Sequence, residues 1–399
     1  MEAKDRSDSG RLRVPDRPSA CVAAGRFVFE ALPSRTVFGW GTSADRLGPE
    51  LAARGAERIL VLCTEAESHL AAAVTAPFED HVVAFFPESR PHVPIEVAEA
   101  ARLLAAEHNA DWLLSIGGGS TTGLAKAIAL KSGLPIAAVP TTYAGSEVTP
   151  IWGITADGRK KTGRAPGVLP SLVVYDPALT TTLPVSITVT SAFNAIAHCV
   201  ESFYAPGRNP VTTLFAEEGI RALASSLQDV VRQPEGRAGR EGLLYGSFLA
   251  GSAFAVAGSG LHHKICHVLG GSLDLPHAET HTVVLPQVLG FNEPAMPAEV
   301  GRICRALPGG FQGVDGSAAA AVFDLIDAAG GPVSLAELGM RRAHVAGMVE
   351  EILEVVPEEN PRPVSADDVF SILDAAFEGR RPSDILQPGG LGGVFDDIP

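Results

Sequence analysis

Six of the eleven histidines lie between residues 198 and 281, and five of these fall within twenty residues. Three pairs are spaced four residues apart: Asn194 with His198, His263 with His267, and His277 with His281. Residues at this spacing share one face of a helix, so the three pairs can converge on one cavity. Imidazoles bind metal ions and also donate protons near neutral pH. A single buried histidine usually has a structural role, but five histidines in so short a stretch are not easily explained in that way. We therefore predict an active site here, and Lys264 lies among these histidines in the sequence.

A glycine-rich turn, Gly117-Gly118-Gly119 followed by Ser120, comes directly after the apolar run Trp112–Ile116 and before a helical stretch. Glycines let a ligand approach the backbone, and the N-terminus of the following helix offers N–H groups to a phosphate. Ligands bind at the carboxyl ends of strands in open α/β sheets. The turn therefore predicts a dinucleotide phosphate site, and a tight turn without a ligand is the alternative.

Polar residues follow two other apolar runs. Glu65 comes just after Arg58–Cys63, where a carboxylate can bind a ribose hydroxyl and repel a 2′-phosphate, which would favour NADH over NADPH. Thr141, Thr142 and Ser146 follow Ile136–Val139, where their hydroxyls could reach ribose or phosphate. A solvated loop carboxylate for Glu65, and a plain turn for the hydroxyls, stay open as alternatives.

Apolar runs in the first half alternate with Ala- and Leu-rich stretches of helical spacing, which predicts a parallel sheet covered on both faces. The runs are Arg58–Cys63, Val82–Phe86, Trp112–Ile116, Ile136–Val139 and Leu172–Tyr175. After about Leu183 clusters of β-branched residues become rare, and helical segments follow at Thr188–Tyr204, Pro210–Val231, Glu241–Ala257, His262–Leu269, Ala318–Ala329 and Ala366–Phe377. We expect a Rossmann-like α/β domain over 25–180, a helical domain over 181–384, and disordered tails at 1–24 and 385–399.

Composition restricts the class of protein. The net charge of −15 argues against binding to nucleic acid or to anionic lipid, so an anionic substrate would need a local positive patch. The five cysteines show neither paired spacing nor a CxxC motif, which indicates reduced thiols in a cytoplasmic protein. No apolar stretch reaches the ~18–20 residues that span a bilayer, and the N-terminus lacks the apolar run of a signal peptide.

Several segments, in this order, resemble the iron-containing alcohol dehydrogenase superfamily and, within it, the maleylacetate reductases. They are GGGSTTGLAKAIAL (117–130), VPTTYAGSEVTP (139–150), NAIAHCVE (194–201), LHHKICHVLGG (261–271), LPHAETHTVVLP (275–286) and NPRPV (360–364). The resemblance runs from about Phe27 to about Pro382. It implies the fold that dehydroquinate synthases share, in which a dinucleotide-binding α/β domain precedes a helical domain.

The resemblance also bears on a metal. Metal-dependent members hold iron or zinc through an aspartate and three histidines, and the matching positions are Asn194, His198, His263 and His277. A neutral amide oxygen is a poor ligand for a divalent ion in a nitrogen site. Maleylacetate reductases resemble this chain in carrying asparagine at the Asn194 position. They also resemble it in carrying glycine at the Gly123 position, where metal-dependent members often have an acidic residue. We therefore expect a degenerate site without a catalytic metal.

The implied reaction is reduction of the carbon–carbon double bond of maleylacetate, or of a close unsaturated oxo-dicarboxylate, to 3-oxoadipate in the degradation of aromatic compounds. The cofactor would be NADH, with NADPH as the alternative. Hydride adds to the alkene carbon β to the ketone, charge develops on the ketone oxygen, and the neighbouring carbon takes a proton. Without a metal, N–H and cationic donors must stabilise that charge.

We expect His198, His263 and His277 to line the reacting centre, and Lys264 and His267 to bind or polarise the substrate. His262, Arg164 or Arg362 would add positive charge for the two carboxylates. The family implies a homodimer, although the sequence reveals no interface. Three alternatives remain: a metal-dependent alcohol dehydrogenase or aldehyde reductase, a lyase or cyclase that uses its cofactor transiently, and a non-enzymatic binding protein.

Overall fold

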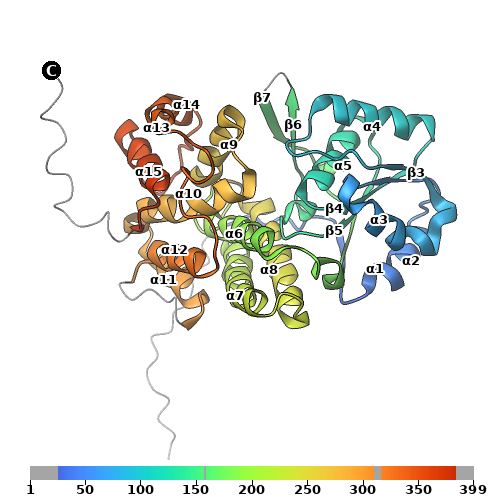
Figure 1. The fold of residues 1–399 in the computed structure, drawn as a ribbon, viewed down its shortest axis with the longest axis horizontal. Helices are drawn as coiled ribbons and strands as arrows, with labels where there is room; N and C mark the ends of the chain where they lie inside the picture. The colour runs from blue at the N-terminus through green and yellow to red at the C-terminus, as the bar shows by residue number, and fades with distance from the viewer. Residues whose placement is uncertain (1–25, 157–158, 310–315, 383–399) are drawn as a thin grey trace, which may run out of the picture.

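The computed structural model describes residues 26–156, 159–309 and 316–382, so both expected tails lie outside the described residues. Six parallel strands form one sheet in the order β1-β8-β5-β4-β2-β3 (Figure 1). The strands are β1 (Arg35–Phe38), β2 (Ile59–Leu62), β3 (Val82–Phe86), β4 (Trp112–Gly117), β5 (Ile136–Pro140) and β8 (Leu172–Tyr175). The predicted parallel sheet is confirmed, and β1 is a strand that the apolar runs did not reveal.

The sheet is covered on both faces, and its central strands are buried along their whole length. Every residue of β2, β4 and β5 is buried. Along β4 the side chains alternate between two cores: Trp112, Leu114 and Ile116 enter one, and Leu113 enters the other. Helices cover these cores, namely α1 (Thr42–Asp45), α2 (Leu47–Ala52), α3 (Ser68–Thr75), α4 (Ile95–Glu107) and α5 (Gly119–Ser132).

A β-hairpin projects from this half toward the helices. Strands β6 (Ile151–Ala156) and β7 (Arg159–Arg164) pair antiparallel. Arg164 ends β7 and donates a hydrogen bond to the carbonyl of Ala255 at 2.6 Å. The hairpin therefore links the sheet half to the helical half.

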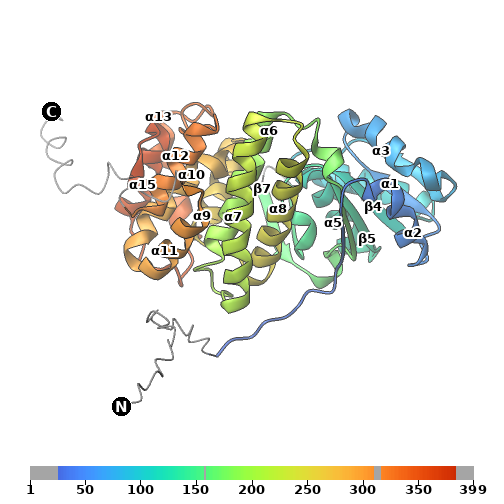
Figure 2. The same cartoon turned by 90° about the horizontal axis from the view of Figure 1, so that it is seen from below.

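The second half is entirely helical in the described residues. Its helices are α6 (Val185–Glu201), α7 (Pro210–Arg232), α8 (Arg237–Ala257), α9 (Leu261–Leu273), α10 (His277–Asn292), α11 (Pro297–Ala306), α12 (Ala318–Ala328), α13 (Arg342–Gly347), α14 (Val349–Leu353) and α15 (Ala366–Glu378). Figures 1 and 2 both place α6 and α8 between the sheet and the C-terminal helices.

None of the described helices is by itself long and apolar enough to cross a membrane. Helices α8 and α9 together have sufficient length and apolar composition, but the pair is bent by 98°.

A buried arginine joins the two halves. Arg240 on α8 is fully buried and donates hydrogen bonds to the Tyr143 hydroxyl and to Thr188 Oγ1, each at 3.0 Å. Tyr143 lies in the loop after β5, and Thr188 lies in the first turn of α6. A buried guanidinium needs hydrogen-bond acceptors for its N–H groups, so the segments that supply these acceptors are held in place around it. The loop after β5 is thereby held at a set position relative to α6.

Candidate active site

Three helices bring the predicted histidines together. Asn194 and His198 come from α6, His262, His263, Lys264 and His267 from α9, and His277 and His281 from α10. The His198 ring stacks on the His263 ring at 5.0 Å, and Phe254 of α8 lies 4.4 Å from the former and 4.6 Å from the latter. Phe254 thus forms an apolar wall beside two of the imidazoles.

The cluster extends from the protein interior to its surface. The ring of His281 lies 4.6 Å from that of His263 and 4.4 Å from that of His277. The ring of His267 lies 5.9 Å from His263 and 6.4 Å from His277. His198, His263 and His281 are buried, His267 is half-buried, and His277 is exposed at the start of α10. The cluster therefore reaches the protein surface at His277.

A buried carboxylate, which the histidine spacing did not reveal, holds His263. The Glu201 carboxylate is fully buried and contacts His263 Nδ1 at 2.5 Å, while it accepts a hydrogen bond from the His263 backbone N–H at 3.1 Å. The Tyr204 hydroxyl also donates to Glu201, at 3.4 Å. Glu201 stands three residues after His198, so its place on the same helix face was the available signal. Two contacts to one residue fix the orientation of the His263 ring.

Burial decides the charge of several imidazoles. Burial, together with the charge of His263, holds the pKa of His198 well below its usual value. Burial lowers the pKa of His262 to about 3 and that of His281 well below its usual value. The expectation that His262 supplies positive charge is therefore wrong, because a protonated ring in this dry position would lose its hydration. His198, His262 and His281 are therefore neutral at pH 7.

The two arginines that we expected near the substrate differ in position. Arg362 lies 4.2 Å over the ring of Phe291 and 3.8 Å from Asp368. Phe291 is fourteen residues beyond His277 on α10, about 21 Å at the helical rise per residue. The Arg362 guanidinium thus has Phe291 and Asp368 as partners, and its expected role in binding the substrate stays a prediction. Arg164, by contrast, binds the carbonyl next to Phe254 in sequence, and Phe254 contacts the cluster.

The glycine turn forms a tight cradle at the carboxyl ends of the strands. Gly117 closes β4 opposite Pro140 of β5, and α5 begins at Gly119, with Ser120 half-buried in its first turn. A Cβ on Gly117 would lie 2.6 Å from Thr121 Oγ1, and a Cβ on Gly118 would lie 3.0 Å from the Thr142 methyl. Only glycine fits such an approach at Gly117, whose φ is +150°.

Acidic and hydroxyl groups surround this cradle. Glu65 is exposed just after β2, whereas Glu67 accepts hydrogen bonds from Thr64 Oγ1 and Thr141 Oγ1, each at 2.7 Å. The Thr141 hydroxyl therefore already has an acceptor. The hydroxyls of Thr121 and Ser146 are buried and have no hydrogen-bond partner among the described residues. Buried hydroxyls are ordinarily paired, so these two fit a bound phosphate.

A buried lysine, also missed from the sequence, holds the loop that carries Ser146. Lys126 of α5 donates hydrogen bonds to the carbonyl oxygens of Ser146 and Ile151 and to Thr149 Oγ1, at 2.6–3.0 Å. Burial lowers the pKa of its ammonium to about 7. Lys126 therefore belongs to the support of the cradle.

Comparisons with known proteins identify the family. Residues 33–177 match the family model of iron-containing alcohol dehydrogenases, and residues 188–377 match the C-terminal model of the same family. The chain belongs to the iron-containing alcohol dehydrogenase family. It is 48% identical to a maleylacetate reductase from Burkholderia cepacia and 45% identical to one from Sphingobium indicum, in each case over 90% of this chain and 99% of the relative. The solved maleylacetate reductase from Agrobacterium tumefaciens is 42% identical, covers 90% of this chain and 100% of its own, and superposes with a TM-score of 0.84.

The resemblance assigns the metal of metal-dependent members to the positions of Asn194, His198, His263 and His277, and the donors at these positions fit a divalent ion poorly. Asn194 Oδ1 and His198 Nδ1 are buried and have no hydrogen-bond partner in the described part of the chain, so both atoms are available to a ligand, and the poor fit lies in the charge of the donor set. The donor set contains three imidazoles and an amide but no carboxylate, and the nearby Glu201 is occupied by His263. At Gly123, a Cβ would lie 2.9 Å from a Val93 methyl, so an acidic side chain there would displace Val93.

Proposed function

We propose that this protein reduces the carbon–carbon double bond of maleylacetate, or of a close unsaturated oxo-dicarboxylate, to 3-oxoadipate. The observation that carries the proposal is the similarity to maleylacetate reductases over nearly their whole length. The site agrees with it, since Asn194 stands one turn before His198 of the imidazole cluster, at the position where metal-dependent members have an anionic ligand.

NADH is the proposed cofactor, with NADPH as the alternative, and when bound it supplies the hydride. The backbone of Gly117–Gly119 and the hydroxyls of Thr121 and Ser146 would hold its phosphates. Thr142 and Ser120 lie next to these glycines. Glu65 follows the end of β2, and we propose that its carboxylate binds a ribose hydroxyl of the cofactor.

In the proposed mechanism Glu201 orients His263 and stabilises it when protonated. Because Glu201 holds Nδ1, the opposite ring nitrogen points away from Glu201 and toward the cluster. His263 can then donate a proton to the carbon next to the ketone, and the buried carboxylate compensates the charge of the imidazolium. The neutral N–H groups of His198 and the other imidazoles stabilise the developing oxyanion.

The substrate carries two carboxylates, which need positive partners within an acidic protein. Lys264 and His267 on α9, together with Arg164 at the end of β7, are the groups that we propose to bind them. His277 stands at the exposed end of the cluster, where the substrate would enter.

We propose that the reaction proceeds without a catalytic metal. The support is the donor set: an amide replaces the one anionic ligand, and neutral imidazoles alone hold a divalent ion less strongly.

We also propose a homodimer that works in the cytoplasm. β1 is the edge strand of the sheet, and Phe27, Val28 and Phe38 expose 46%, 87% and 41% of their surface. An open edge with apolar side chains can be covered by a second copy. A monomeric mass by light scattering would contradict the dimer.

The proposed compartment rests on the cysteines. The four described cysteines are free thiols, which suits a reducing compartment such as the cytoplasm.

The test of the activity is to follow NADH absorbance with maleylacetate and then with small aldehydes, with and without a chelator. The proposal predicts NADH oxidation with maleylacetate that the chelator leaves unchanged. Oxidation with aldehydes alone, abolished by the chelator, would support a metal-dependent alcohol dehydrogenase instead.

A further inference from the structure

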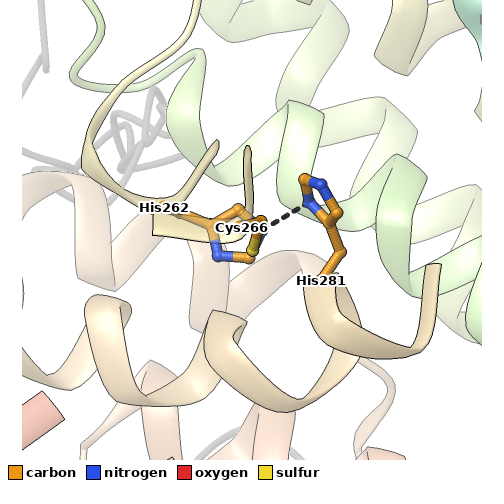
Figure 3. A group of neighbouring side chains, drawn as sticks. All are labelled: His262, Cys266 and His281. Atoms are coloured by element: carbon orange, nitrogen blue, oxygen red, sulfur yellow. Dashed lines mark hydrogen bonds between the residues drawn. The ribbon is translucent and has the colours of Figure 1, made fainter. Parts of the chain in front are cut away.

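A second group of metal-ligating side chains lies in the core behind the active-site cluster. His262 and Cys266 stand four residues apart on α9 and so share a face, while His281 reaches them from α10 (Figure 3). The exposed fractions of the three side chains are 0%, 1% and 0%. None of them is among the family's metal positions at 194, 198, 263 and 277.

The spacing of the three ligand atoms matches a single bound ion. His262 Nε2 lies 2.9 Å from His281 Nδ1 and 3.8 Å from Cys266 Sγ. All three atoms lie within 4.8 Å of one another, and this is the one such group of histidine, cysteine and acidic residues in the described chain. Ligands bound at about 2.0 Å from nitrogen and about 2.3 Å from sulfur stand roughly 3–4 Å apart around an ion. Small side-chain rotations would therefore suffice to bind one.

The nitrogens of His262 and His281 that face each other are the ones that would bind the ion. The contact between His262 and His281 uses one nitrogen of each ring. The other nitrogens, His262 Nδ1 and His281 Nε2, are buried and have no hydrogen-bond partner among the described residues. An ion bound at the facing nitrogens would leave these two unchanged, so the position of the three buried ligand atoms carries the inference and the unpaired nitrogens do not.

The donor chemistry selects the ion. Thiolate and imidazole prefer soft or borderline metals, whereas magnesium and calcium prefer oxygen ligands. We propose that His262, Cys266 and His281 form a binding site for a soft monovalent cation, copper(I). The ion displaces the thiol proton to solvent: the S–H bond breaks, an S–Cu bond forms, and no electron is transferred. One thiolate then cancels the single positive charge, which a dry site requires.

The histidine cluster provides a route to this site and a consequence of its occupation. The ring of His281 contacts the exposed His277 and the buried His263. An ion can pass from the surface along these imidazoles. Once bound, it fixes His281 and joins α9 to α10 next to the proposed reacting centre, so loading is expected to inhibit turnover.

The test is titration of the full, reduced protein with copper(I) under anaerobic conditions, in competition with a coloured copper(I) chelator. We expect one tightly bound equivalent in the wild type. Cys266→Ser and His281→Phe should each bind at least about ten-fold more weakly. Cys304→Ser, which removes a half-buried thiol on α11, should bind like the wild type. Loss of binding in Cys304→Ser, or in His198→Asn but not in Cys266→Ser, would place the ion elsewhere and overturn the proposal.

A measurement on the unaltered protein covers the case in which a variant does not fold. X-ray absorption at the copper edge should give a first shell of two nitrogens and one sulfur. A shell of sulfur alone or nitrogen alone, or failure to bind an equivalent at all, would refute the site. Because the readout is the bound ion itself, its failure would leave the proposed reduction of maleylacetate untouched.

Discussion

At the scale of single residues, the pair of Glu201 and His263 organises the site. A carboxylate that is fully buried requires a partner, and His263 supplies both its ring and its backbone N–H. The neighbouring buried imidazoles have no such carboxylate contact among the hydrogen bonds of the described residues, and burial lowers the pKa of His198 and His281. His263 is therefore the imidazole best placed to carry a positive charge during the reaction.

Replacing Glu201 by Gln should lower kcat about 10- to 100-fold, because a group that orients a reacting histidine typically contributes that much. The KM for NADH should change little, since the glycine cradle lies on the other half of the protein. Steady-state kinetics with maleylacetate provide the measurement, and Glu217→Gln on the surface of α7 is the matched control. An equal loss in both variants, or a rise in the KM for NADH alone, would assign Glu201 a different role.

Replacing Asn194 by Asp restores the anionic ligand of the metal-dependent members. The variant should bind about one equivalent of zinc under conditions in which the wild type binds none. Asn209→Asp is the control, because it makes the same chemical change at a helix N-cap, where aspartate is also favoured. If Asn194→Asp still fails to bind zinc, the geometry of the cavity, and not the missing negative charge, is what excludes the metal.

The sequence predicted most of the residues in the cluster but not their charge. Spacing of four along a helix is a local property, so Asn194, His198, His263 and His267 could be found without a structure. Glu201 contacts His263 across 62 residues, and no local pattern reports such a contact. Burial is likewise set by the tertiary fold, which is why the sequence led us to expect a positive charge on His262.

At the scale of elements, apolar runs predicted the strands that are buried on both faces. The five predicted runs lie within a residue or so of β2, β3, β4, β5 and β8. The strands that were not predicted are β1, which is partly exposed, and the hairpin of β6 and β7, which ends in the charged sequence RKKTGR. Half-exposed and polar strands carry a weak periodic signal, so their pairing emerges only in the folded chain.

The glycine cradle leads to a prediction at this scale. Gly117→Ala would place a methyl group 2.6 Å from Thr121 Oγ1 and 2.7 Å from Glu67, at a φ that L-residues avoid. The affinity for NADH, measured by fluorescence titration, should fall about ten-fold or more, which corresponds to the usual effect of overpacking. Gly167→Ala is the control, because nothing lies within 4 Å of its added Cβ. Equal NADH affinity in both variants would show that the cradle does not bind the cofactor.

At the scale of the whole molecule, the buried neutral histidines make the fold sensitive to acid. The pKa of His262 is about 3 in the folded chain and 6.5 ordinarily. In that interval the unfolded chain binds more protons, so stability is greatest above about pH 6.5 and falls as the pH drops toward 3. Each pH unit within the window should cost about 1.4 kcal/mol for such a histidine.

Thermal midpoints measured from pH 7.5 to pH 5 test this dependence. The wild type should lose stability steadily below about pH 6.5, and His262→Phe should show a shallower slope, whatever its stability at pH 7.5. His69→Phe, which replaces an exposed histidine on α3, should keep the wild-type slope. An unchanged slope in His262→Phe would mean that His262 is not buried as a neutral ring.

The central claim is that hydride reaches an alkene carbon with no metal at the histidine cluster. The direct test is turnover of maleylacetate by metal-stripped protein with NADH deuterated at the nicotinamide C4, followed by NMR of the product. We expect 3-oxoadipate with deuterium on the carbon that was β to the ketone and a solvent proton on the adjacent carbon. Deuterium on a carbinol carbon, or turnover that returns only when zinc or iron is added, would contradict it.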